Sequence, residues 1–114
     1  YWMRRFNLDA KKMVRGAGSD AAAFTASFDG LQKAYDGLQG FVKAEGTDLK
    51  APFKAYSGHT DRYHAAAKRL RRARAAEPTD PKLIEREHKA LIQAYNTLIA
   101  IGNSMFELEA HGLL

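Results

Sequence analysis

Two pairs of a carboxylate and a histidine are the residues of this chain with the most evident potential for chemistry. Asp61 precedes His64 by three positions, and Glu85 precedes His88 by the same interval. In a helix this spacing puts both side chains of a pair on one face. Helical bundles that hold two metal ions use two such pairs together with two further glutamates from other helices.

The count of ligands argues against this metal site. The neighbouring helical segment offers Asp29 and Asp36 but no glutamate in its interior. Counting from the turns puts residues 61–64 level with about residues 92–95, not with residues 85–88. The chain has no cysteine, which excludes thiolate ligands, disulfides and a cysteine nucleophile. We therefore predict no metal, no cofactor and no catalytic residues, since no other catalytic arrangement is recognisable either.

Tyrosines form a second group with chemical potential. Residues 31–38 and 91–98 share Leu, Ala, Tyr and Leu in register, which makes Tyr35 and Tyr95 equivalent positions. Spacings of four and three residues are typical of the buried stripe of a helix. Counting from the turns, we expect both tyrosines to face the middle of the helix between them in sequence, near residue 60.

The predicted layer combines aromatic rings with hydroxyl groups, and it has two interpretations. Its members are Tyr35, Tyr56, His59, Thr60, Tyr63 and Tyr95. Each buried hydroxyl needs a partner, because an unpaired one costs about 1 to 3 kcal/mol. In the interpretation that we favour, the hydroxyls bond one another or backbone carbonyls and fix the register of the helices. The alternative is a tyrosine-lined pocket for a small ligand, as in a carrier or a sensor domain.

Basic residues gather where two of the predicted helices end. They are Lys11, Lys12, Arg15, Lys68, Arg69, Arg71, Arg72 and Arg74. Cations at a helix C-terminus complement its dipole, each by about 0.3 to 1 kcal/mol. The alternative is an anion-binding pole for a phosphate-rich polymer or lipid headgroups, which the formal net charge of +5 favours. No aromatic residues alternate with these cations, which argues against sequence-specific binding of nucleic acid.

Four helical segments must position these residues. The apolar periodicity predicts helices over about 1–15 and 20–45, a third from a cap at Thr47 or Asp48 to about residue 76, and a fourth over 81–111. Ser19 is expected to cap the second helix and Gly46 to end it, and Asp80 with Pro81 should start the fourth. Helices joined by tight turns lie antiparallel. The predicted fold is therefore all-α, a single up-and-down helical bundle over residues 1–114 with three long helices and a shorter N-terminal one.

One face of the second predicted helix carries only small side chains, from Ala23, Ser27, Gly30, Ala34, Gly37 and Ala44. Glycine inside a helix costs about 1 kcal/mol relative to alanine, so close packing against another helix should compensate. That helix belongs either to the same chain or to a protein partner or second copy. The segment Tyr1–Phe6 mixes aromatic and basic residues, which suits a membrane interface or packing of Trp2 and Phe6 on the bundle.

Residues 91–99, Leu-Ile-Gln-Ala-Tyr-Asn-Thr-Leu-Ile, resemble the Tyr-Asn helix motif of the YiiG-like bacterial envelope lipoproteins. Residues 31–38 match it less closely, with Asp36 in place of the asparagine. The resemblance implies an all-helical, exported and anchored protein of unknown function, whose lipidated cysteine would lie upstream of Tyr1. We expect the bacterial periplasm or envelope, with the cytoplasm as the alternative. We predict a non-enzymatic binding module for a protein partner or an anionic ligand, ahead of the small-ligand carrier.

Overall fold

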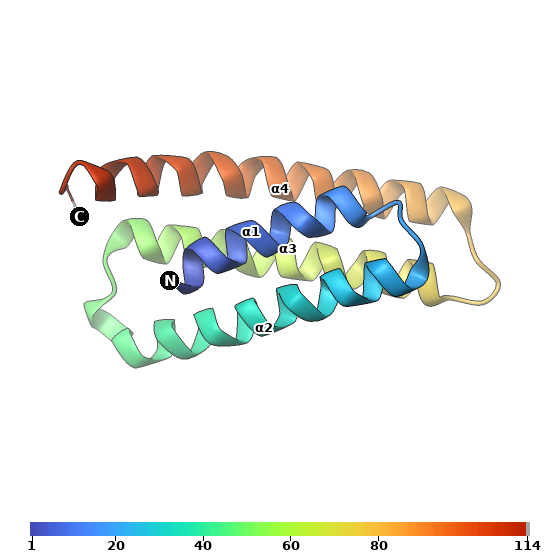
Figure 1. Cartoon of the computed structure of the whole chain (residues 1–114), viewed down its shortest axis with the longest axis horizontal. Helices are drawn as coiled ribbons and strands as arrows, with labels where there is room; N and C mark the ends of the chain where they lie inside the picture. Colours follow the sequence, from blue (N-terminus) through green and yellow to red (C-terminus); the bar gives the residue numbers. More distant parts are fainter. Residues whose placement is uncertain (114) are drawn as a thin grey trace.

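The computed structural model describes residues 1–113 and folds them into four antiparallel helices (Figure 1). These are α1 (Trp2–Gly16), α2 (Ala21–Glu45), α3 (Ala51–Ala75) and α4 (Pro81–Ala110), with a short 3₁₀ turn, η1 (Gly46–Asp48), between α2 and α3. No strand occurs in this part of the chain. The predicted all-α helical bundle is confirmed.

Two helix ends form as the sequence predicts. The Asp80 carboxylate accepts hydrogen bonds from the backbone N–H groups of Lys82 and Leu83, and Pro81 occupies the first turn of α4. Gly46 ends α2 with a φ of +55°, in the left-handed region where residues with a Cβ are strained. Both signals are local, which is why the sequence alone locates them.

Two predicted caps are wrong. Asp20, not Ser19, caps α2, because its carboxylate accepts a hydrogen bond of 2.8 Å from the Ala23 N–H. The Ser19 hydroxyl instead donates to the Gly16 carbonyl and closes the turn after α1. Neither Thr47 nor Asp48 caps α3, because both belong to η1 and the N-cap position falls on Lys50, which makes no side-chain capping bond.

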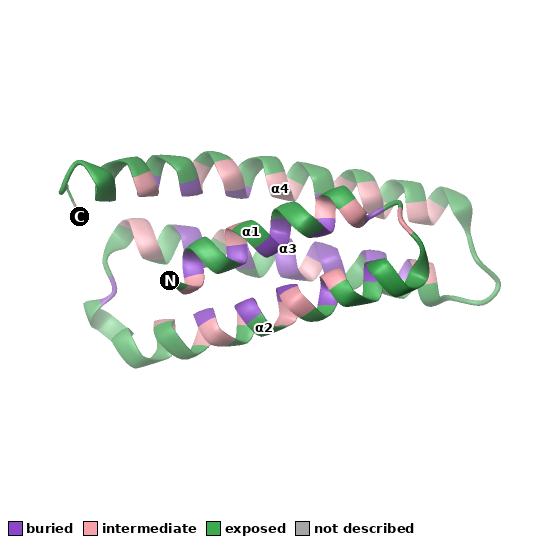
Figure 2. Cartoon of the chain, in the orientation of Figure 1, coloured by how far each residue is buried: buried purple, intermediate pink, exposed green. Residues whose placement is uncertain are grey.

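The bundle consists of two helical hairpins. Helix α1 packs mainly on α2, and α3 mainly on α4, while fewer contacts join the two hairpins. Buried side chains line the inner faces of all four helices (Figure 2). The largest that are fully buried are Phe6, Met13, Leu31, Leu38, Tyr56, Tyr63, Leu70, Leu91 and Leu98. Although α1 is short, it therefore contributes to the centre of the core.

Helix α1 covers the middle of the small-residue face of α2, whereas Ala23 and Ala44 near its two ends are exposed. A Cβ added at Gly37 would overlap the ring of Trp2, and one at Gly30 would lie 3.5 Å from an Asp9 carboxylate oxygen. These contacts correspond to the first alternative for that face, close packing against another helix of the same chain. Binding of a protein partner or a second copy there would require displacement of α1, and it stays a prediction. None of the helices within residues 1–113 combines the length and the apolar character needed to cross a membrane.

Candidate functional site

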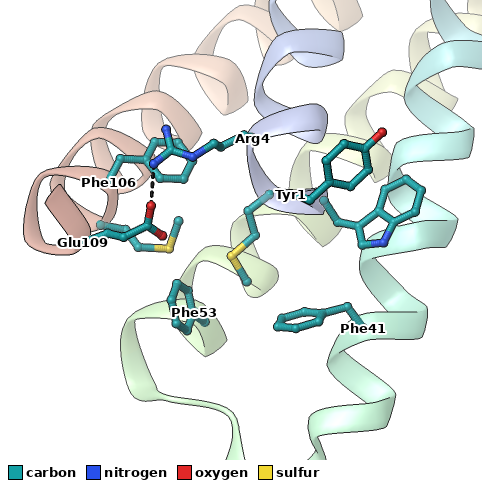
Figure 3. A pocket seen from close by; sticks show the side chains of 9 residues that line it. Tyr1, Arg4, Phe41, Phe53, Phe106 and Glu109 are labelled. Carbon is teal, nitrogen blue, oxygen red and sulfur yellow. Dashed lines mark hydrogen bonds and ion pairs between the residues drawn. The ribbon is translucent and has the colours of Figure 1, made fainter. Parts of the chain in front are cut away.

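An aromatic cavity lies at the end of the bundle where α1 begins (Figure 3). Its volume is about 340 Å³, within the range of small-molecule sites. The walls come from all four helices and consist of Tyr1, Trp2, Met3, Arg4, Phe41, Phe53, Met105, Phe106 and Glu109. Seven of these nine side chains are aromatic rings or methionines, so the cavity offers a mainly apolar surface.

The cavity lies beside the start of α1, the shortest of the four helices. Its 15 residues span about 22 Å, whereas the whole bundle is 50 Å long. The start of α1 is set inward from the ends of α2, α3 and α4 (Figure 1). Phe41, Phe53 and Phe106 reach the cavity from α2, α3 and α4, and Arg4 of α1 lies against the Phe106 ring. Phe41 is 36% exposed, so part of its ring is accessible from solvent.

Arg4 and Glu109 supply the only two charged side chains of the cavity wall. The Arg4 guanidinium lies 4.4 Å from the centre of the Phe106 ring and donates a hydrogen bond of 2.5 Å to Glu109 Oε1 (Figure 3). Both side chains are about half exposed. An exposed ion pair of this kind contributes about 0 to 1 kcal/mol, so a competing group can replace it at little cost.

A shallow groove continues from the cavity along α1 and α4. It is lined by Arg4, Asn7, Leu8, Lys11, Tyr95, Ile99, Asn103 and Phe106, and its volume is about 480 Å³. Arg4 and Phe106 belong to both the cavity and the groove. The stacked pair therefore marks the boundary between a mainly apolar end and a groove with amide and cationic side chains.

The predicted tyrosine layer is assembled only in part. Tyr35 and Tyr63 both contact the Phe6 ring, at centroid distances of 6.2 and 5.9 Å, and Tyr95 meets Tyr63 edge to face at 6.3 Å. Tyr56 lies apart from them and packs against Phe106 at 6.1 Å, near the cavity.

The hydroxyls of the two fully buried tyrosines bond to α1. The Tyr63 hydroxyl donates to the Ala10 carbonyl at 2.7 Å, and the Tyr56 hydroxyl lies 2.9 Å from the Met3 carbonyl and 2.8 Å from Asn7 Oδ1. Burial raises the pKa of both phenols. These contacts are those of a structural clasp. Of the predicted pocket residues, Tyr95 alone lines the cavity or the groove described above.

The other predicted members of the layer have local roles. The Thr60 hydroxyl is buried and donates to the Ser57 carbonyl of its own helix at 2.6 Å. His59 is partly exposed, and the histidine beside the tyrosines is His64. The prediction missed His64 because it was considered only as a metal ligand. The available signal was helical spacing, because His64 lies four residues after Thr60 and three before Ala67.

His64 belongs to a hydrogen-bonded cluster between α2 and α3. Its ring stacks on Tyr35 at a centroid distance of 3.9 Å, and its Nε2 donates to Gln32 Oε1 at 2.8 Å. The Gln32 amide nitrogen donates in turn to Asp36, which orients its oxygen towards His64. The Tyr35 hydroxyl donates to Asp61 at 2.6 Å. Burial, reinforced by the bond to Asp61, raises the pKa of Tyr35 to about 12.

From this cluster we predict that the folded protein loses stability at acidic pH. Burial, with a smaller effect of Lys68, lowers the pKa of His64 below its ordinary value of 6.5. The unfolded chain therefore takes up a proton that the folded protein resists, so the contribution of neutral His64 to stability is lost as the pH falls below about 6.5. The variant His64→Gln should show a smaller decrease in the free energy of unfolding between about pH 8 and pH 5.

Urea denaturation of both proteins across this pH range measures the effect. At about pH 8, where His64 is neutral whether folded or unfolded, the difference between the two proteins gives the packing cost of the substitution alone. Equal pH dependence in the wild type and in His64→Gln would show that His64 does not resist protonation in the fold.

The basic residues are divided between structural and solvent-exposed positions. Arg74 donates to the carbonyls of Ala17 and Ser19 and covers the Phe24 ring at 4.3 Å, so it joins the end of α3 to the turn after α1. Arg71 covers the Phe28 ring at 4.6 Å, and Arg69 pairs with Glu87 at 3.2 Å. The remaining cations of the predicted pole are exposed and form no ion pair within residues 1–113; they are Lys11, Lys12, Arg15, Lys68 and Arg72.

The two ends of the predicted basic pole do meet in space, as the bonds of Arg74 show. Anion binding there stays a prediction, now with fewer cations available for a ligand. In the described part of the chain no three His, Asp or Glu side chains converge as a metal site would require. The resemblance to the YiiG-like proteins also stays a prediction, because no model of a protein family, no curated protein and no solved structure matches this chain.

Proposed function

We propose that this protein is a non-enzymatic binding domain that holds a small apolar ligand in the cavity at the open end of the bundle. The observation that carries the proposal is the cavity of about 340 Å³ walled by Trp2, Phe41, Phe53 and Phe106. Burial of apolar surface contributes about 25 cal/mol per Å², and each methylene group about 0.8 kcal/mol. A short alkyl chain or an aromatic ring would gain affinity from this surface.

This proposal keeps the small-ligand carrier predicted from sequence but moves its site. The tyrosines at the centre of the bundle are occupied by contacts within the protein. Tyr56 and Tyr63 are fully buried, and their hydroxyls are hydrogen-bonded to α1. The end cavity has partly exposed aromatic walls that a ligand can reach from solvent. The alternative of an anionic or protein partner rests on the exposed cations of the basic pole.

Trp2 provides a direct probe of binding, because it is the single tryptophan of the chain and forms part of the cavity wall. Decanol titrated into the protein is expected to produce a saturable change in Trp2 fluorescence and to raise the melting temperature. The variant Phe41→Lys should weaken decanol binding about tenfold, which corresponds to about 1.4 kcal/mol, because it places a charge at the mouth of the cavity.

Ile92→Lys is the matched control. Ile92 on α4 is 37% exposed, close to the 36% of Phe41, and it lies outside the cavity wall. It should bind decanol like the wild type. Absence of a saturable response in the wild type, or equal weakening by both substitutions, would overturn the proposal.

A further inference from the structure

We infer that the ligand is a single-chain anionic amphiphile, whose carboxylate binds Arg4 while its alkyl chain fills the aromatic cavity. This inference rests on the proposed function and deepens it. Arg4 lies where the mainly apolar cavity meets the groove, whose lining is more polar than that of the cavity. A molecule with an alkyl chain and a charged head is likewise apolar at one end and polar at the other, so its two parts match the cavity and the groove.

The Arg4 guanidinium is well placed to receive a carboxylate. It has five N–H donors in a planar fork, and one of them bonds to Glu109 Oε1. One face of the guanidinium lies against the Phe106 ring, which holds the guanidinium where the cavity meets the groove. A second carboxylate can approach the free donors, or it can replace the exposed Glu109 in the same pairing geometry.

The groove beyond Arg4 supplies further groups suited to an anionic head. Lys11 lies on α1 two turns after Arg4, and Asn103 lies on α4; both line the groove. Asp and Glu residues are absent from the lining of the groove, whereas the cavity includes Glu109. A carboxylate that points from the cavity into the groove would therefore move away from the negative charge of Glu109 and towards positive charge.

Decanoate and decanol test the inference, since they share a chain length and differ in the head. At neutral pH and low salt, the wild type is expected to bind decanoate about tenfold more tightly than decanol. Arg4→Gln should remove the preference for decanoate, because it should weaken decanoate binding much more than decanol binding. Glu109→Gln should strengthen decanoate binding several-fold, because it removes the competing carboxylate, and should change decanol binding by a smaller factor.

Lys11→Gln and Lys12→Gln form a matched pair. Both lysines are exposed on α1, but only Lys11 lines the groove. Decanoate binding should weaken by about twofold to threefold in Lys11→Gln and remain unchanged in Lys12→Gln, with salt reducing the difference.

The outcomes separate this inference from the proposed function. If decanol binds but decanoate binds no more tightly, and Arg4→Gln alters neither, the cavity takes neutral ligands and the inference is wrong. If neither compound binds the wild type, the proposed function itself fails. If Lys11→Gln and Lys12→Gln weaken decanoate binding equally, the head is attracted by overall charge and not by the groove. Melting temperatures of all variants without ligand establish that each is folded.

Discussion

Truncation of Phe6 to alanine is expected to lower the free energy of unfolding by about 3 to 5 kcal/mol, the usual cost of removing a large aromatic side chain from a core. Phe6 is fully buried, and its ring contacts Tyr35 of α2 and Tyr63 of α3. The substitution would leave a cavity between three helices that cannot all move inwards together. Because domains of this size are stable by about 5 to 15 kcal/mol, a large part of the stability depends on this one ring.

Leu8→Ala is the control for this prediction. Leu8 follows two residues later on α1 and is 50% exposed, so its truncation should change stability by no more than about 0.5 kcal/mol. Urea denaturation followed by circular dichroism measures both variants. Similar small losses for the two substitutions would mean that α1 does not insert into the core as described.

Replacement of Gly37 by alanine is expected to destabilise the protein, although alanine normally stabilises a helix by about 1 kcal/mol relative to glycine. The added methyl group would overlap the Trp2 ring, which packs directly on the glycine. Overpacking of this kind costs about 1 to 3 kcal/mol, and displacement of Trp2 should also shift its fluorescence.

Replacement of Gly40 on the same helix by alanine is expected to have the opposite effect on stability. No heavy atom lies within 4 Å of a Cβ added there, so Gly40→Ala should stabilise the protein by about 1 kcal/mol. The two alanine variants should therefore differ in sign, as measured by urea denaturation. If both were stabilised to the same extent, Trp2 would not be seated on Gly37.

Much of the fold follows from local signals in the sequence. Asp80 with Pro81 and Gly46 mark helix ends by short-range chemistry, and the stripe that contains Tyr56, Tyr63 and Leu70 follows helical periodicity. These features depend on residues within one or two turns, so a single sequence is enough to predict them. The assignment of the α2 cap to Ser19 failed because Asp20 next to it competes for the same backbone N–H groups.

The candidate site depends on features that the sequence does not contain locally. Counting residues from the turns placed Tyr35 and Tyr95 near residue 60, and Tyr35 does bond to Asp61, but the count did not show that Tyr56 would pack apart from them against Phe106. The aromatic cavity was not predicted at all. Phe41, Phe53 and Phe106 lie near the ends of three different helices, and only the packing of those helices brings them into one wall.

The hydroxyl bonds to α1 also determine how the two hairpins can move. Tyr56 and Tyr63 are seven residues apart on α3, and so are their acceptors Met3 and Ala10 on α1. A slip of one helical turn, about 5.4 Å, would break both bonds at once and leave buried polar groups unpaired. Separation would also break these bonds, but it would expose the hydroxyls and carbonyls to water, so we expect the hairpins to separate as rigid units and not to slide.

Separation of the hairpins would be an opening smaller than complete unfolding, and hydrogen exchange would detect it as a cooperative unit. Phe41 and Trp2 belong to one hairpin, whereas Phe53 and Phe106 belong to the other, so the same opening would divide the cavity wall. A molecule bound between them would hold the hairpins together by mass action. The hydroxyl bonds of Tyr56 and Tyr63 and a molecule bound in the cavity would thus oppose separation of the hairpins at two different places along their interface.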